Sequence, residues 1–141
     1  MGIAVLYSKL NPYANEPLYK TDGAAGVDLS TIESVILQPN QITSINTGIA
    51  FEIPYGFYGK ISDRSSMALK GTSVKAGIID SDYRGEIIVL LRNDTSEPIE
   101  INANDRIAQI IFQEHQRATL VLRKDLSRSG RSSGGFGSTG V

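Results

Sequence analysis

Short segments rich in β-branched and aromatic residues recur about every ten residues along the chain, and Gly, Pro, Asn and Asp separate them. Several of these segments alternate apolar with polar positions, which is the period of a strand with one buried face. The pattern predicts strands at residues 3–6, 27–30, 35–37, 42–45, 48–53, 57–62, 87–92, 99–101, 107–112 and 119–122. Turn-forming residues between them predict turns at 39–40, 54–56 and 102–105.

Only residues 65–70 are typical of a helix, and that helix is short. Many brief strands with almost no helix favour an all-β fold in which two sheets pack face to face, as a β-sandwich or jelly roll. A chain of 141 residues suits one such domain. The last fifteen residues hold five glycines and five serines, and their only apolar side chains are Phe136 and Val141. We therefore expect one β domain over residues 1–126 and a flexible glycine-rich arm over residues 127–141.

The charge balance and the amino-acid usage exclude several classes of function. Fourteen basic and fifteen acidic residues leave a net charge of −1, which gives no electrostatic grip on long nucleic acid or on an anionic membrane. The absence of cysteine excludes disulfides and thiolate-bound metals. His115 is the only histidine and stands in a polar run, so we expect a surface residue and no catalytic triad. Without a targeting segment or an apolar run of about 18 residues, we expect a soluble intracellular protein of the cytoplasm or nucleus.

The glycine-rich arm carries chemistry that a plain linker does not need. Arg131 can fork onto phosphate oxygens, and Ser138 and Thr139 can add hydroxyl donors. The glycines let backbone N–H groups turn toward an anion, and Phe136 offers a flat face for a base. Together these groups suggest a nucleotide, although a terminal Gly/Ser linker has the same composition.

Residues 76–86 hold three acids, an arginine, a tyrosine and two glycines directly before an apolar strand. Their spacing fits a hairpin whose turn carries charged and aromatic side chains. Backbone groups at such a tip can pair with the edge of a base, a carboxylate can act as general base toward water, and Tyr83 can pack against a sugar. A solvated turn uses the same residue types and is the alternative.

Three further patches are weak signals individually. Arg64-Ser65-Ser66 opens the predicted helix, where serines either cap free N–H groups or join the arginine in an anion site. Gln109 is a polar position, like Arg106, on an otherwise apolar strand, and a buried glutamine needs a hydrogen-bond partner. Asp28 places a carboxylate between apolar neighbours at the start of a strand.

Taken in order, these five patches closely resemble the five motifs of the trimeric deoxyuridine triphosphatases, the dUTP pyrophosphatases of nucleotide metabolism. The matching segments are residues 25–29, 64–66, 76–86, 105–109 and 131–140. The resemblance implies a jelly-roll-like subunit in a homotrimer, with each active site built from three chains and the C-terminal arm of one subunit closing over the site of another. It also implies hydrolysis of dUTP to dUMP and pyrophosphate, which cleanses the nucleotide pool and supplies dUMP for dTMP synthesis.

The same matching implies roles for single residues. Asp80 corresponds to the base that activates the water attacking the α-phosphorus. Tyr83 corresponds to the ring under the deoxyribose that excludes a 2′-hydroxyl, and the backbone of Gly77, Ile78 and Ile79 to the one that pairs with uracil. The residues implied to contact the phosphates or to stack on the base are Arg64, Ser65, Ser66, Gln109, Arg131, Phe136, Gly137, Ser138 and Thr139.

The resemblance also implies Mg2+ as a cofactor. The phosphates hold most of its coordination, which suits an ion that keeps its waters. Asp28 corresponds to a carboxylate near this ion that acts through water, so no direct protein ligand is expected. We interpret Asp82 and Arg84 as structural, as an ion pair that stiffens the hairpin.

Four positions depart from the family pattern. Asp63 stands where a non-acidic residue is common, Met67 replaces leucine, and Asn104 and Ser132 replace glycine. None of the four removes a proposed catalytic group. Asp63 could repel phosphate or pair with a neighbouring base, and Ser132 could slow closure of the arm.

Two rival functions are open at this point. A dCTP deaminase, in some cases bifunctional, shares the fold, but Asp80 and the fully matched arm disfavour it. A non-catalytic module that senses dUTP or docks a protein is the second rival. Turnover of pyrimidine triphosphates separates all three.

Overall fold

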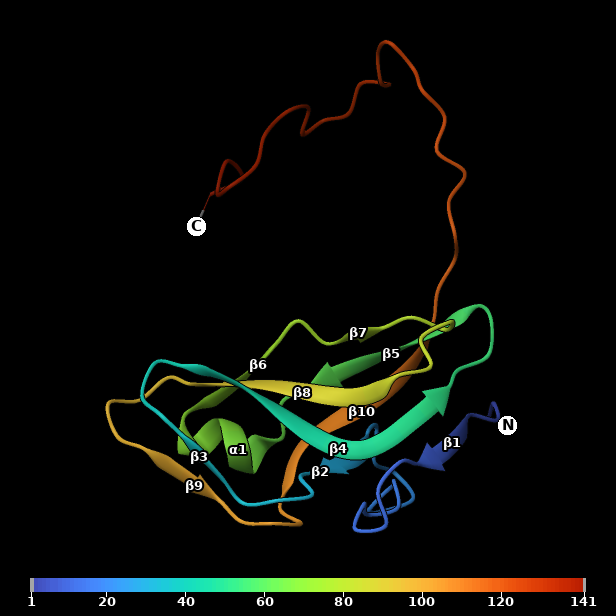
Figure 1. The fold of residues 1–141 in the computed structure, drawn as a ribbon. Helices are drawn as coiled ribbons and strands as arrows, with labels where there is room; N and C mark the ends of the chain where they lie inside the picture. The colour runs from blue at the N-terminus through green and yellow to red at the C-terminus, as the bar shows by residue number, and fades with distance from the viewer. Residues whose placement is uncertain (1, 141) are drawn as a thin grey trace.

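The computed structural model describes residues 2–140 and consists of antiparallel sheets (Figure 1). One sheet has the order β1-β4-β8-β6, with strands Leu6–Lys9, Ile42–Glu52, Glu86–Asn93 and Thr72–Lys75. The second has the order β2-β10-β5-β7, with strands Val27–Ser30, Arg106–Glu114, Phe57–Ser62 and Ile78–Ile79. A small sheet pairs β3 (Val35–Leu37) with β9 (Ile99–Ile101). The prediction of an all-β sandwich with a short helix is confirmed.

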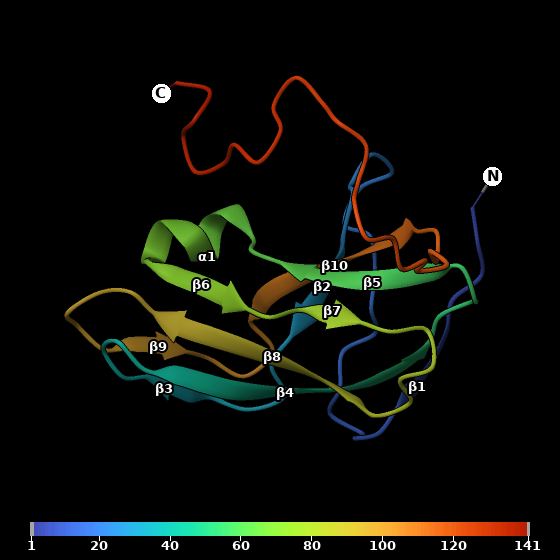
Figure 2. The same cartoon turned by 90° about the horizontal axis from the view of Figure 1, so that it is seen from above.

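The two four-stranded sheets form layers that enclose the apolar core (Figure 2). The residues of β8 alternate between half-buried and buried, so that Ile87, Val89 and Leu91 all face the interior. Phe51 of β4 meets Phe112 of β10 edge to face, with ring centroids 5.4 Å apart. This contact joins the two sheets across the core.

The strands predicted at 42–45 and 48–53 are one long strand, β4. Its register with β8 shifts between Asn46 and Ala50, and Gly48 there has a φ of +71°. A bulge of this kind bends a strand without ending it, which is why the sequence pattern is interrupted while the strand continues.

Three other expectations about strands are wrong. The first strand lies at Leu6–Lys9 and not at 3–6, because it is Leu6–Lys9 that pairs with β4. β6 and β7 were not predicted, since they are short and owe their extended state to pairing with β8 and β5. Residues 119–122 form no strand: the side chains of Leu120 and Leu122 are 91% and 96% exposed, and no neighbouring strand offers them a ladder.

The helix α1 spans Ser65–Lys70, as predicted. Met67 is its buried residue, and Gly71 ends it in a left-handed conformation with a φ of +100°. No helix among residues 2–140 is long and apolar enough to cross a membrane.

The chain leaves the body of the molecule after β10. Residues 115–140 contain no helix or strand, and Figures 1 and 2 show this segment running away from the sheets. The glycine-rich stretch is its outer part.

Candidate active site

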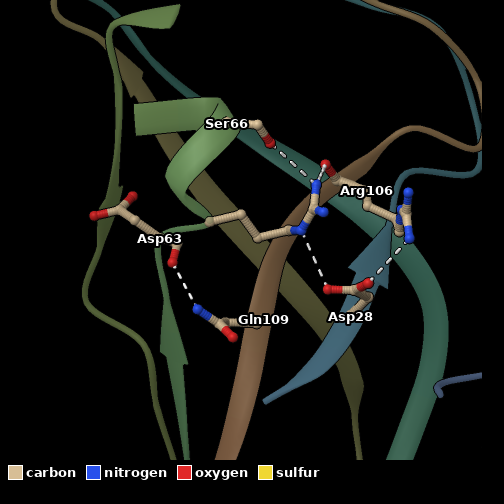
Figure 3. Close-up of polar contacts among 6 residues, drawn as sticks. Asp28, Asp63, Ser66, Arg106 and Gln109 are labelled. Carbon is tan, nitrogen blue, oxygen red and sulfur yellow. Dashed lines mark hydrogen bonds and ion pairs between the residues drawn. The ribbon is translucent and has the colours of Figure 1, made fainter. Parts of the chain in front are cut away.

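Asp28 of β2 lies between two arginines that come from different elements (Figure 3). Its Oδ1 is 3.1 Å from Nε of Arg64, which immediately precedes α1, and its Oδ2 is 3.4 Å from Nη1 of Arg106 at the start of β10. The Asp28 side chain is only 17% exposed. Both oxygens of a largely buried carboxylate therefore face a cation, which compensates for its desolvation.

The guanidinium of Arg64 is held on more than one side. Its Nη1 donates to the backbone carbonyl of Arg106 at 3.0 Å and to Oγ of Ser66 at 3.3 Å. Arg64 is itself the N-cap residue of α1, and it makes no side-chain capping bond. The serines therefore do not cap the helix: Ser66 contacts the arginine, and Ser65 lies exposed beside it.

Gln109 is the half-buried polar position on β10, and its amide has a partner. Nε2 donates to the backbone carbonyl of Asp63 at 2.9 Å. On the other side, a Cβ built at Gly26 would lie 2.9 Å from Cβ of Gln109 and would also meet its Oε1. Gly26 thus leaves the space that the glutamine side chain occupies, since any larger residue would displace it.

The segment at 76–85 connects β6 to β8, which are antiparallel neighbours. The predicted hairpin is therefore present in its two arms. Within the connection, however, Ile78 and Ile79 form β7 and pair with Lys60 and Gly59 of β5. The two strands of the hairpin, β6 and β8, belong to one sheet, while β7 in the connection between them belongs to the other sheet. The connection is therefore held against the sandwich.

A left-handed turn directs the chain into β7. Ala76 and Gly77 have φ angles of +57° and +116°. The carbonyl of Gly77 accepts a hydrogen bond from the backbone N–H of Ile61 at 2.7 Å, and a Cβ at Gly77 would lie 2.7 Å from the carbonyl oxygen of Ile61. Only glycine satisfies both the backbone angle and this close approach.

Asp80 follows β7 and is exposed. It lies on the wall of a cavity of about 370 Å³, and no ion pair within residues 2–140 includes its carboxylate. The other residues lining the cavity are Tyr55, Gly56, Tyr58, Ser81, Asp82, His115 and Arg117. His115 is exposed, as predicted, and packs edge-on against Tyr58 with ring centroids 5.5 Å apart.

The expected ion pair between Asp82 and Arg84 is wrong. Nε of Arg84 lies 3.5 Å from Oε1 of Glu52. The reason is the register of the sheet: Glu86 pairs with Ala50, so the residue two before Glu86 lies opposite the residue two after Ala50. Sequence proximity within the hairpin did not decide the partner.

Tyr83 is 41% exposed, while its hydroxyl makes a hydrogen bond to the backbone. The hydroxyl donates to the carbonyl of Glu86 at 2.7 Å. The ring also covers Gly85, where a Cβ would lie 2.7 Å from Cζ of Tyr83. The ring is thus held in place at the end of the hairpin.

The arm residues do not meet the rest of the site within one chain. Nε of Arg131 donates to the carbonyl of Gly134 at 2.7 Å, and the ring of Phe136 is fully exposed. Figure 1 shows the arm, including residues 137–139, well separated from the sheets. Val141 lies outside the described residues.

Within one chain the predicted site residues therefore fall into three places. Asp28, Arg64, Ser66 and Gln109 gather around the start of α1 and β10, and Arg64 and Ser66 line a polar cavity of about 300 Å³. Asp80 lines a different cavity and belongs to the connection 76–85, which also holds Gly77, Ile78, Ile79 and Tyr83, and the arm is a third element. The sequence assigned no role to Arg106, although it was a polar position on an otherwise apolar strand.

The departures from the family pattern fit their surroundings. Met67 is buried in the core, where it fills a volume similar to leucine. Asn104 and Ser132 have φ angles of +71° and +54°, so both occupy the left-handed region in which glycine is usual. Asn tolerates that region better than most side chains. Asp63 makes no ion pair within residues 2–140; its Oδ1 accepts from the backbone N–H of Val74 at 2.8 Å.

Comparison with known proteins identifies the family. The family model described as dUTPase matches residues 12–140. The chain belongs to the dUTPase family. This dUTPase is 48% identical to the deoxyuridine 5′-triphosphate nucleotidohydrolase of Anaeromyxobacter sp. over 127 residues, 88% of this chain and 86% of that protein. It is 40% identical to the enzyme of the same name from Paramecium bursaria Chlorella virus 1, over 98% of this chain and 99% of that protein.

Solved structures agree with the family. The dUTPase of Staphylococcus bacteriophage 80alpha with dUPNHPP superposes with a TM-score of 0.90, at 26% identity, over 98% of this chain and 99% of that one. A dUTPase from phage phi11 of S. aureus, described as coordinating a structural Mg(II) ion, has a TM-score of 0.80 at 22% identity, over 87% and 98% of the two chains. The second likeness concerns the fold alone.

Proposed function

We propose that this dUTPase hydrolyses dUTP to dUMP and pyrophosphate through a water that Asp80 activates for attack on the α-phosphorus. Membership of the family supports the substrate. The observation that carries the choice of base is the Asp80 carboxylate, which is exposed to a cavity of about 370 Å³ and free of ion pairs within residues 2–140. A carboxylate without a cationic partner remains available to accept a proton from water.

Arg64, Ser65, Ser66 and Gln109 bind the phosphates in this proposal. Because Asp28 and a backbone carbonyl already orient the Arg64 guanidinium, phosphate binding orders little additional side chain. The hydroxyl of Ser66 accepts from Arg64, which leaves its own proton for a phosphate oxygen. The pre-set donors supply charge stabilisation as the α-phosphorus is attacked.

The base and the sugar are selected at the hairpin. β7 is the last strand of its sheet, so one edge of Ile78 and Ile79 pairs with β5 while the other has no strand partner within residues 2–140. Free backbone donors and acceptors of this kind can pair with the edge of uracil next to Gly77. The ring of Tyr83, fixed through its hydroxyl, is suited to lie under the deoxyribose and to exclude a 2′-hydroxyl.

We further propose a homotrimer in which residues 1–126 form the β domain and residues 127–141 the closing arm. Arg64 and Asp80 line different cavities of one chain, and the arm reaches neither, which supports a site shared between chains. Leu120, Val121 and Leu122 are 91%, 72% and 96% exposed, as is typical of an interface segment. In the trimer, Arg131, Gly137, Ser138 and Thr139 contact the outer phosphates and Phe136 stacks on uracil.

Mg2+ completes the proposal as an ion bound by the triphosphate and by water. No three His, Asp or Glu side chains within residues 2–140 gather to hold a metal ion, and both oxygens of Asp28 already face arginines. The residues around Asp28 therefore fit an ion that the substrate's phosphates hold. Asp28 would contact such an ion only through a water molecule. When bound, the ion neutralises charge on the phosphates.

A pyrophosphate-release assay with dUTP, dCTP, dTTP and UTP tests the function. We expect release from dUTP and far less from the other three. Ammonia from dCTP, or binding of dUTP without turnover, would select one of the rival functions instead.

Asp80→Asn tests the base. We expect kcat to fall by about a hundredfold or more while dUTP still binds, because the amide cannot accept the proton from water. Asp82→Asn is the matched control, since it removes a neighbouring carboxylate from the same cavity. A near-normal rate for Asp80→Asn would place the base elsewhere.

A further inference from the structure

Asp63 connects the start of α1 to two other elements. Its side-chain Oδ1 accepts from the backbone N–H of Val74 in β6 at 2.8 Å, and its backbone carbonyl accepts from Nε2 of Gln109 in β10 at 2.9 Å. In Figure 3 its carboxylate points away from Asp28 and Arg106. The charge at this position is therefore turned from the cluster around Arg64 and is used in a contact with the backbone.

The hydrogen bond to Val74 replaces one that a strand would make. β6 is the last strand of its sheet, with β8 on one side only. The N–H groups along its outer edge have no ladder partner, and Val74 is packed against the core. The carboxylate of Asp63 supplies the acceptor that a further strand would otherwise provide.

The carbonyl of the same residue orients the Gln109 side chain. Since Nε2 is committed to Asp63, the amide oxygen is the end directed to the space beside Gly26. Residue 63 is thus held through its side chain by one sheet and through its backbone by the other. Arg64 is the next residue, so its backbone is set by both contacts.

We propose that Asp63 is a positioning residue, which anchors the phosphate-binding segment 64–66 to β6 and sets the Gln109 amide. This inference rests on the phosphate-binding role given to Arg64, Ser65, Ser66 and Gln109 under the proposed function. The acceptor oxygen of the Asp63 side chain makes this contact, and its negative charge is not needed. Asparagine at position 63 therefore preserves the hydrogen bond, whereas alanine removes it.

The test compares Asp63→Asn with Asp63→Ala in dUTP turnover and in binding of the analogue dUpNHpp. For Asp63→Ala we expect kcat/KM to fall about tenfold and dUpNHpp to bind about fivefold more weakly, since the loss of one positioned hydrogen bond is of that size. For Asp63→Asn we expect both values within about twofold of the parent protein. Asp22→Ala is the control, because no hydrogen bond or ion pair within residues 2–140 includes the side chain of this exposed acid.

Amide hydrogen exchange at Val74 provides a readout independent of catalysis. Exchange should accelerate about tenfold in Asp63→Ala and stay unchanged in Asp63→Asn, since only the former leaves the N–H without its acceptor. If Asp63→Ala does not fold, Asp63→Ser takes its place, because its hydroxyl oxygen lies one bond closer to the backbone than the carboxylate oxygen that accepts from Val74.

Equal losses in Asp63→Asn and Asp63→Ala would assign the effect to charge and overturn the proposal. So would unchanged exchange at Val74 in the alanine variant. If the parent protein binds dUpNHpp but does not hydrolyse dUTP, the proposed function fails, while the binding and exchange measurements still decide the role of Asp63.

Discussion

Gly77→Ala tests whether the left-handed turn before β7 holds the hairpin in place. The φ of +116° at this position costs an alanine about 1–2 kcal/mol. The new Cβ would lie 2.7 Å from the carbonyl oxygen of Ile61, so the backbone has to move and the hydrogen bond from the Ile61 N–H to the Gly77 carbonyl is lost. Because Ile61 is only 4% exposed, its unpaired N–H costs a further 1–3 kcal/mol or so.

We therefore expect Gly77→Ala to destabilise the protein by about 4 kcal/mol, or to lower the Tm by about 15 °C. Turnover of dUTP should fall more than about a hundredfold even at temperatures where the variant is folded, since β7 and Asp80 are displaced. Thermal unfolding by circular dichroism and pyrophosphate release measure the two effects at one fixed protein concentration.

Gly56→Ala is the matched control for stability. Gly56 also has a positive φ, +90°, but nothing lies within 4 Å of a Cβ built there. This substitution carries the backbone cost alone, about 1–2 kcal/mol. If both variants unfold at the same temperature, the contact with Ile61 has no weight and the reasoning about the turn is refuted.

Three further outcomes can be checked with the same assays. Gly26→Ala should raise the KM for dUTP about tenfold and also lower the Tm, because the new methyl group would lie 2.9 Å from Cβ of Gln109 and displaces that side chain from Asp63; an unchanged KM would separate Gln109 from the phosphates. Truncation after Arg128 should remove most activity while a sizing column still shows a trimer, and undiminished turnover would make the arm a mere linker. Chelation of Mg2+ should lower turnover without changing the Tm, since no acidic cluster within residues 2–140 needs the ion to fold; a fall in Tm would indicate a structural ion.

Much of the fold could be predicted because short runs of β-branched and other apolar residues between turn residues mark strands. β8 is the clearest case: residues 87–91 are all apolar, and the pleat of the strand turns Ile87, Val89 and Leu91 into the core, where all three are fully buried. β6 and β7 lacked such a pattern, because their strand state depends on partners distant in sequence. Residues 119–122 show the reverse, a strand-like composition without a strand to pair with.

For the candidate site, too, the sequence predicted some features and the structure supplied others. Residue types marked the hairpin 76–86, Arg64, Gln109 and the arm as candidate functional groups, and the resemblance selected Asp80 as the base and joined these groups in one activity. Contacts could not be read from the chain: Arg84 pairs with Glu52, not with Asp82, because strand register decides which side chains face each other. Likewise, the carboxylate of Asp63 accepts a hydrogen bond from the backbone N–H of Val74, a contact that the sequence did not indicate.

The sequence by itself determined the all-β class, the short helix and the family, since these depend on local alternation and on motifs carried within short segments. Only the tertiary structure decided that Asp28 bridges Arg64 and Arg106, and that Arg64 and Asp80 of one chain line separate cavities. The physical reason is that hydrogen bonds and ion pairs form between residues that sheet pairing brings together across many positions of the chain. The local sequence pattern determines the secondary structure and the chemical groups a segment offers, and the register of the sheets determines which other side chains those groups contact.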